Sequence, residues 1–225
     1  MREMDDLSVD VVFTSPPYND SGRTDRDVET KRHIKYQNIE YRDDWFEWQC
    51  ECIDEMLRVA KRIVMYNVQA LLSNREDVYR LIGHYAEKIH QILVWYKPNA
   101  QPQPYEHRIG NAYEMVLILR CRQFKNLHIN SKQYRNVIVQ NINPDHAYSD
   151  KHRAIMSGDF CKEIIKEFTQ EGETVLDPFM GLATTGIHAI NNKRNFVGIE
   201  INEEYFKLAE KRLLQETSQM SIFDL

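Results

Sequence analysis

Hydrophobic residues along this chain of 225 residues gather in short runs that polar or Pro- and Gly-containing segments separate. Runs of about four to eight residues rich in Val, Ile, Phe and Tyr are typical of buried strands. Stretches with apolar residues at helical spacing alternate with these runs, and this alternation predicts an α/β fold. The predicted strands are Val9–Phe13, Ile63–Tyr66, Ile89–Tyr96, Tyr113–Leu119, Val175–Leu176 and Phe196–Glu200.

The helical stretches carry recognisable start and stop signals. Ser73 and Glu76 have the spacing of a capping box, and Asn202 is placed to cap a helix whose first turn holds two glutamates. Trp45 and Trp48 fall on the apolar side of their stretch, which favours a core position over base stacking. The predicted helices are Asp43–Arg62, from Ser73 to about Lys88, about Asp159 to Thr169, from Thr184, and Asn202 to about Gln215.

The first strand ends in Thr14-Ser15-Pro16-Pro17-Tyr18. Each proline fixes its own φ, and Pro17 also restricts the residue before it, so the turn has a preset shape. Ser15 Oγ and the Pro16 carbonyl can accept the two hydrogens of an exocyclic amino group, while Tyr18 stacks on the ring that bears it. The alternative for these five residues is a purely structural turn.

A second motif lies far downstream. Val175–Thr185 reads as a strand, a glycine turn and the start of a helix, and the strand Phe196–Glu200 ends in an acid about twenty residues beyond the turn. This is the βαβ layout of nucleoside binding, in which the acid holds ribose hydroxyls. Ala183 replaces a further glycine, which favours adenosine without phosphate over a dinucleotide. The alternative is an ordinary βαβ packing unit.

Ser15-Pro16-Pro17-Tyr18 and Asp177-Pro178-Phe179-x-Gly181-x-x-Thr184-Thr185 resemble the catalytic and cofactor motifs of the DNA amino-methyltransferases that use S-adenosylmethionine, and their order resembles the permuted β group. The resemblance implies a Rossmann-like methyltransferase fold with a mixed, mostly parallel sheet, helices on both faces and a circularly permuted motif order. It implies catalytic roles for Ser15, Pro16, Pro17 and Tyr18. The implied cofactor-binding residues are Thr14, Asp177, Pro178, Phe179, Gly181, Thr184, Thr185 and Glu200.

Ser-Pro-Pro-Tyr in this family leans toward cytosine N4 and Asp-Pro-Pro-Tyr toward adenine N6, so N4-cytosine is favoured and N6-adenine is the alternative. Both bases present an amine that needs two acceptors, and the chemistry alone does not separate them. A further alternative is a non-catalytic DNA-binding remnant, based on Ala183 and on the lack of the strand and Gly-Asp turn that the family usually carries upstream. Methylation of RNA is another.

The net charge of −5 argues against a uniformly basic DNA-binding surface, so any DNA face must be local. Residues 19–42 form a polar stretch with the length of a mobile loop that closes over DNA. Residues 120–150 fall where the β group has its target-recognition segment, and no acid occurs from Met115 to Pro144. Each stretch has a solvated surface segment as its alternative. The candidate DNA contacts are Arg23, Arg26, Lys31, Arg32, Lys35, Arg120, Arg122, Lys125, Lys132 and Arg135.

The length predicts a single domain over residues 1–216, followed by a flexible tail over 217–225. Gln219–Phe223 resembles the peptide by which bacterial DNA enzymes dock on the sliding clamp; the alternative is a tail that folds back. The four cysteines show no metal or disulfide spacing, and no apolar run has membrane-spanning length. We therefore expect a cytoplasmic protein with reduced thiols, no metal and no membrane contact. The sequence is compatible with a homodimer.

Overall fold

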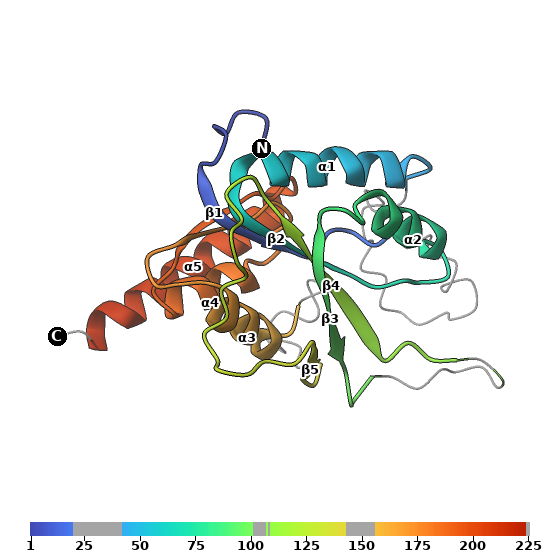
Figure 1. Cartoon of the computed structure of the whole chain (residues 1–225). Coiled ribbons are helices and arrows are strands. Elements are labelled where there is room, and N and C mark those ends of the chain that lie inside the picture. The colour runs from blue at the N-terminus through green and yellow to red at the C-terminus, as the bar shows by residue number, and fades with distance from the viewer. Residues whose placement is uncertain (20–41, 101–106, 108, 143–155, 224–225) are drawn as a thin grey trace.

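The computed structural model describes residues 1–19, 42–100, 107, 109–142 and 156–223, with the backbone alone for residues 219–223. Within these residues, seven strands form one sheet in the order β5-β3-β4-β2-β1-β6-β7 (Figure 1). The strands are β1 Val9–Thr14, β2 Ala60–Val68, β3 Ile89–Tyr96, β4 Tyr113–Arg120, β5 Val137–Val139, β6 Thr174–Asp177 and β7 Asn195–Gly198. The helices are α1 Trp45–Val59, α2 Arg75–His84, α3 Gly158–Phe168, α4 Thr184–Asn191 and α5 Glu203–Phe223.

The direction of β4 decides which strand ends meet. β4 runs antiparallel to its neighbours β2 and β3, whereas the other four pairings in the sheet are parallel. The start of β4 therefore lies at the same edge of the sheet as the ends of the remaining strands. This arrangement confirms the predicted mixed, mostly parallel sheet.

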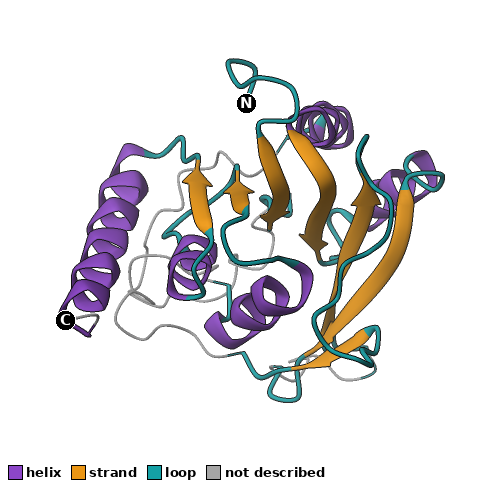
Figure 2. Ribbon diagram, turned by 60° about the vertical axis from the view of Figure 1, so that its left-hand side comes forward, coloured by secondary structure: helices purple, strands orange, loops and turns teal. Residues whose placement is uncertain are grey.

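Helices cover both faces of the sheet (Figure 2). Successive strand residues point to opposite sides, so one strand can pack against helices on both faces. Val12 of β1 packs in the cluster that contains Trp45 of α1. Its neighbours Val11 and Phe13 pack instead in the cluster that contains Phe160 of α3. The predicted α/β layering and the core position of Trp45 are both confirmed.

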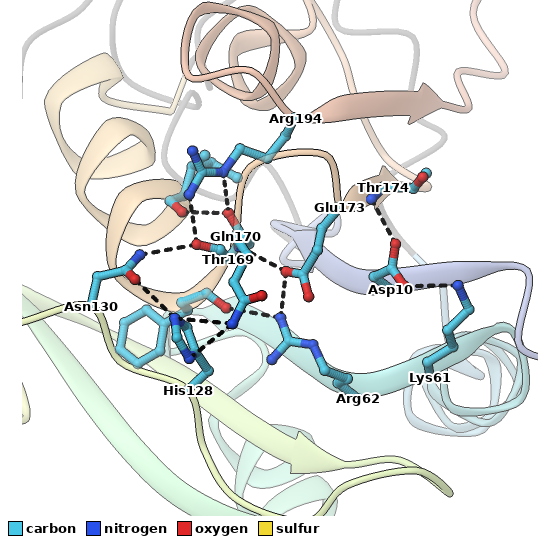
Figure 3. A network of polar contacts seen from close by, with 12 residues as sticks. Asp10, Lys61, Arg62, His128, Asn130, Thr169, Gln170, Glu173, Thr174 and Arg194 are labelled. Atoms are coloured by element: carbon cyan, nitrogen blue, oxygen red, sulfur yellow. Dashed lines mark hydrogen bonds and ion pairs between the residues drawn. The ribbon is translucent and has the colours of Figure 1, made fainter.

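A network of ion pairs joins the central strands at the edge where β1 begins (Figure 3). Asp10 of β1 accepts hydrogen bonds from Lys61 Nζ at 2.7 Å and from the backbone N–H of Thr174 at 2.8 Å. Arg62 Nη2 lies 2.6 Å from Glu173 Oε2. These contacts fix β1, β2 and β6 in register at one end.

Two predicted element boundaries are wrong, at the end of the first helix and at the start of the strand that follows it. The helix predicted to reach Arg62 ends at Val59, and β2 begins at Ala60 instead of Ile63. The backbone of Ala60 is already extended, at φ −86° and ψ 139°, and Ala60 pairs with Val9. Pairing along the whole of β1 therefore draws the helical pattern's last residues into the strand.

The capping box predicted at Ser73 is also wrong. α2 starts one residue later, with Asn74 at the N-cap position and without a capping hydrogen bond from its side chain, and it ends at His84 rather than Lys88. The Asn74 side chain instead accepts from the N–H of Leu71 and donates to the carbonyls of Gln69 and Tyr18. Those tertiary contacts compete successfully with local capping.

The last helix is longer than predicted. α5 continues to Phe223, so residues 217–223 are helical. The hydroxyls of Thr217 and Ser218 donate to backbone carbonyls three or four residues earlier, at 2.7 to 3.1 Å. These bonds accommodate polar residues within the helix. At its other end, Asn202 Oδ1 accepts from the N–H groups of Glu204 and Tyr205, as the predicted cap requires.

Candidate active site

The proline turn and the glycine turn lie side by side at one edge of the sheet. β1 and β6 are adjacent and parallel, with Val12 opposite Leu176, so their carboxyl ends coincide. Thr14 Oγ1, the last residue of β1, donates a buried hydrogen bond of 2.6 Å to Asp177 Oδ1, the last residue of β6. The two motifs, 163 residues apart in sequence, are thus in direct contact.

Asp177 sits in a fully buried position at the base of the glycine turn. Its side chain is 2% exposed and also accepts from the backbone N–H of Phe179 at 3.1 Å. Burial raises the pKa of its carboxyl to about 6, although the hydrogen bonds from Thr14 and Phe179 act in the opposite direction. Asp177 therefore carries its negative charge at neutral pH at a cost in stability.

The glycine turn is closed by Glu200, which follows β7. Gly181 adopts φ +51°, a left-handed conformation that suits glycine, and its N–H donates to Glu200 Oε2 at 2.9 Å. Glu200 Oε1 accepts from the N–H of Asn202 at 2.8 Å. Both carboxylate oxygens are thereby oriented, and each keeps capacity to accept a further hydrogen bond.

The other predicted cofactor residues lie around and beneath this turn. Pro178, Thr184 and Thr185 are buried, so they support the turn rather than line its surface. Phe179 is partly exposed and packs edge to face against Trp48, with ring centroids 5.8 Å apart. Ala183 is left-handed, at φ +59°, and precedes α4. Alanine can adopt this conformation at a small energetic cost, so the missing glycine does not prevent the turn from forming.

The proline turn is held from two sides. Trp45 Nε1 donates to the carbonyl of Pro17 at 2.9 Å, and Asn74 Nδ2 donates to the carbonyl of Tyr18 at 2.6 Å. Asn74 is 1% exposed, so its side chain is fixed by packing as well as by hydrogen bonds. Both helices of this face, α1 and the start of α2, therefore position the turn.

Three polar residues beside the turn were not predicted from the sequence: Asn67, Lys97 and Glu114. Tyr18 Oη donates to Glu114 Oε2 at 2.8 Å and lies 2.9 Å from Ser15 Oγ. Asn67 Nδ2 lies 2.6 Å from the same Glu114 oxygen and 2.9 Å from Tyr18 Oη. Lys97 Nζ lies 2.9 Å from Glu114 Oε1, with the two side chains only 7% and 12% exposed.

Antiparallel pairing explains how this cluster forms. Glu114 is near the start of β4, whereas Asn67 and Lys97 are at or just beyond the ends of β2 and β3, so all three reach the same edge. The available signal was a single acid within the apolar run Tyr113–Leu119. Burial and the charge of Glu114 together raise the pKa of Tyr18 well above its ordinary value, so its hydroxyl keeps its proton.

The predicted DNA contacts have different locations. Arg23, Arg26, Lys31, Arg32 and Lys35, with most of the loop 19–42, lie outside the described residues, as do residues 143–150 of the recognition segment. Arg120 ends β4 at the edge opposite the proline turn, where Arg122 pairs with Asp6 at 3.2 Å. Lys125, Lys132 and Arg135 are exposed on the segment that leads to β5. The structure does not bring Arg120 and Arg122 to the candidate site.

The described residues contain no group of three or more His, Cys, Asp and Glu side chains that could hold a metal ion. Among the helices described, none combines the length and the apolar character needed to span a membrane.

This α/β sheet, with a glycine turn beside a rigid proline turn at one edge, defines a Rossmann-like fold. Residues 9–211 match the family model described as DNA methylase (N6_N4_Mtase). The chain belongs to this family of DNA amino-methyltransferases, which confirms the predicted amino-methyltransferase family and the predicted Rossmann-like fold.

Its relatives include enzymes for both bases. The chain is 26% identical to the Type II methyltransferase M2.DpnII of Streptococcus pneumoniae, over 96% of this chain and 86% of that protein. It is 28% identical to the DNA adenine methyltransferase YhdJ of Escherichia coli, over 92% of this chain and 76% of that protein. Among solved structures, the cytosine-N4-specific PvuII DNA methyltransferase superposes with a TM-score of 0.70 at 18% identity, covering 99% of this chain and 87% of that one.

Proposed function

We propose that this chain transfers a methyl group from S-adenosylmethionine to the exocyclic amino group of a base flipped out of duplex DNA, with cytosine N4 favoured over adenine N6. The observation that carries the proposal is the Thr14–Asp177 hydrogen bond, which puts the proline turn and the glycine turn in one site. The motif order supports a circularly permuted member of the β group.

The residues of the glycine turn fit an adenosine ligand without phosphates. Glu200 is a preoriented acceptor for ribose hydroxyls, and the left-handed Gly181 leaves room beside it. Asp177 and Phe179 are placed for the methionine end and for contact with the ligand. When bound, S-adenosylmethionine supplies an electrophilic methyl group on a sulfonium.

The proline turn supplies the groups that act on the base. An amine inside a duplex is out of reach, so the base must leave the stack at a cost of a few kcal/mol. Stacking on Tyr18 offsets about 1–3 kcal/mol of this cost. Ser15 Oγ and the Pro16 carbonyl accept the amine hydrogens, draw the nitrogen toward tetrahedral geometry and stabilise the positive charge that develops on it. Alignment of the reacting groups does most of the catalytic work.

Ser15 favours cytosine N4, because in this family the motif Ser-Pro-Pro-Tyr is more typical of N4-cytosine enzymes. The relatives do not separate the two bases, since YhdJ is named as an adenine enzyme and the PvuII enzyme as a cytosine-N4 enzyme. The exposed Lys125, Lys132 and Arg135 are proposed to contact DNA phosphates, together with the basic residues of the loop 19–42.

The deciding experiment incubates the protein with duplex DNA and S-adenosylmethionine, digests the DNA to nucleosides and identifies N4-methylcytosine or N6-methyladenine by mass spectrometry. Ser15→Ala should lose most turnover and keep cofactor affinity, whereas Glu200→Ala should lose cofactor affinity. RNA of the same sequence is the control acceptor. Absence of cofactor binding would instead support the non-catalytic remnant, and N6-methyladenine as the product would overturn the N4 assignment.

We also propose that Gln219–Phe223 docks on a bacterial sliding clamp. The residues lie in the last turns of α5, so docking as an extended peptide would require these turns to unwind. Fluorescence anisotropy of a labelled chain with purified clamp tests this, with Ile222→Ala and Phe223→Ala in one variant as the control. Light scattering of the same sample reports whether the chain forms the homodimer that its sequence allows.

A further inference from the structure

The hydroxyl of Tyr18 is the middle of a hydrogen-bond chain that begins at Ser15 and ends at Glu114. Ser15 Oγ and Tyr18 Oη are 2.9 Å apart, and Tyr18 Oη is 2.8 Å from Glu114 Oε2. Lys97, whose side chain is 7% exposed, places its ammonium 2.9 Å from the other oxygen of Glu114. The chain thus connects the catalytic turn to a nearly buried ion pair on β4.

The carboxylate determines the direction of this chain. An ionised carboxylate only accepts hydrogen bonds, so Tyr18 must donate its single hydroxyl hydrogen to Glu114. Asn67 Nδ2 donates to the same oxygen at 2.6 Å, since the opposite amide orientation would put two acceptors against each other. Tyr18 Oη is then an acceptor toward Ser15, whose hydrogen it receives. Asn67 Nδ2 lies 3.3 Å from Ser15 Oγ and can occupy one of its lone pairs, and the other remains available for a donor in the site.

We propose that Glu114 is a positioning residue which, through Tyr18, holds Ser15 as a hydrogen-bond acceptor for the target amine and takes up the proton that methylation releases. The proposal rests on the proposed function and deepens it, because it explains how one serine hydroxyl is kept from donating to the amine. A serine free to rotate would present its hydrogen as often as its lone pairs.

The proton balance closes along the same chain. The amino nitrogen forms a bond to the methyl carbon with its lone pair, and the electron pair of the broken carbon–sulfur bond stays on sulfur. One N–H bond then breaks and leaves its electron pair on nitrogen, while its proton passes to Ser15 Oγ. The Ser15 hydrogen moves to Tyr18 and the Tyr18 hydrogen to Glu114. The product amine and the Glu114 carboxyl end neutral, and water later removes the proton.

The test compares Glu114→Gln with a matched control. Glutamine keeps the size of the side chain, but its amide can donate to Tyr18 and so reverse the direction of the hydrogen bonds between Ser15, Tyr18 and residue 114. We expect the single-turnover methylation rate to fall about tenfold to a hundredfold, as for the loss of a hydrogen bond to a charged group. Dissociation constants for cofactor and for duplex DNA should stay within about twofold. Glu173→Gln, which removes the partly exposed ion pair with Arg62 at the opposite edge, should leave the rate unchanged.

A double-mutant cycle separates this role from a structural one. Tyr18→Phe keeps the stacking ring and breaks the chain, so it should lower the rate by a similar factor even if Glu114→Gln fails to fold. In the Tyr18→Phe background, Glu114→Gln should cost little more, because residues acting as one unit are not additive. Fully additive losses, or a Tyr18→Phe rate equal to wild type, would overturn the proposal.

Ser15→Ala keeps the two levels of the argument distinct. A Ser15→Ala protein as active as wild type would remove the proposed function of the turn and this inference with it. An inactive Ser15→Ala protein beside a fully active Glu114→Gln protein would overturn the inference alone. A changed cofactor affinity in Glu114→Gln would point to a structural effect on the glycine turn and also count against it.

Discussion

Replacing Asp177 with asparagine should make the protein less sensitive to pH. Asp177 is fully buried between the two turns, where burial raises the pKa of its carboxyl to about 6 from an ordinary value of 3.8. At 1.36 kcal/mol per pKa unit, this difference destabilises the native state by about 3 kcal/mol at pH 7. Asparagine keeps an oxygen to accept from Thr14 and Phe179 but carries no charge.

The sign follows from proton binding. Between pH 3.8 and about 6 the native protein holds a proton on Asp177 that the unfolded chain has already lost. The native state therefore binds more protons there, and its stability falls as the pH rises through this window. Above about pH 7 the penalty is complete and constant. The asparagine variant lacks this loss. About 0.6 kcal/mol of it is already present at pH 4, so the stability of the variant relative to wild type should rise by about 2.4 kcal/mol from pH 4 to pH 7.

Urea unfolding followed by far-UV circular dichroism measures this difference, at pH steps from 4 to 7.5. A buried amide group can add a cost of its own of about 1–3 kcal/mol, but that cost is the same at every pH. The quantity that tests the reasoning is therefore the change in the difference between the two proteins. A difference that stays flat across the window, or that changes in the opposite direction, would refute the assigned pKa.

Asp10 provides a control of opposite sign at the other end of β1. Burial alone would raise the pKa of its carboxyl, but the hydrogen bonds from Lys61 and from the Thr174 N–H outweigh burial and lower it. A lowered pKa stabilises the native state above the ordinary pKa, and the stabilisation is lost as the pH falls. Asp10→Asn should therefore destabilise the protein at pH 7 and have a smaller effect in acid.

Three further substitutions test the support of the site and the packing of the fold. Asn74→Ala removes the donor to the Tyr18 carbonyl and should lower turnover at least about tenfold with cofactor affinity unchanged, measured by single-turnover kinetics and calorimetry. Gly198→Ala would place a Cβ 2.2 Å from Met180 Sδ and should destabilise the fold by about 1–3 kcal/mol in urea unfolding. Gly83→Ala, in a helix with no atom within 4 Å of the added Cβ, should instead stabilise it by about 0.5–1 kcal/mol.

Sequence patterns predicted the elements that local chemistry determines. The strand Ile89–Tyr96 has the predicted bounds because its apolar run is bounded by turns. The meeting of the two turns was predictable too, since parallel strands end at a common edge. The early end of α1 at Val59 was not predictable, because pairing of Ala60 with β1 overrides the helical preference. The tertiary role of Asn74 was not predictable either, because its contact with Tyr18 overrides local capping.

The Glu114 cluster shows what single-sequence reasoning lacks. Its members come from β2, from β4 and from the residue after β3, and only the antiparallel direction of β4 brings Glu114 to the edge that carries the proline turn. With β4 parallel to its neighbours, the same residue would lie at the opposite edge, beside Asp10 and Arg62. An acid within an apolar run signals a buried polar contact, but the sequence does not state the strand direction that selects its partners.

Ion pairs and hydrogen bonds stabilise the start of β1, whereas a buried charge next to its end destabilises the protein. The stable start keeps the strands in register and so maintains the geometry of the site. At its start, Asp10 is tied to Lys61 and to the Thr174 N–H, and Arg62 pairs with Glu173, so the register of β1, β2 and β6 is set away from the chemistry (Figure 3). At its end, Thr14 donates to Asp177 of β6, a buried acid with a raised pKa at the base of the glycine turn. The charges of Asp10 and Glu173 are therefore paired with Lys61 and Arg62, which hold the sheet together. The charge of Asp177 destabilises the protein, and a positively charged ligand would compensate it. Cofactor binding should accordingly stabilise wild-type protein more than the Asp177→Asn variant at pH 7, an outcome that thermal unfolding with and without S-adenosylmethionine measures directly.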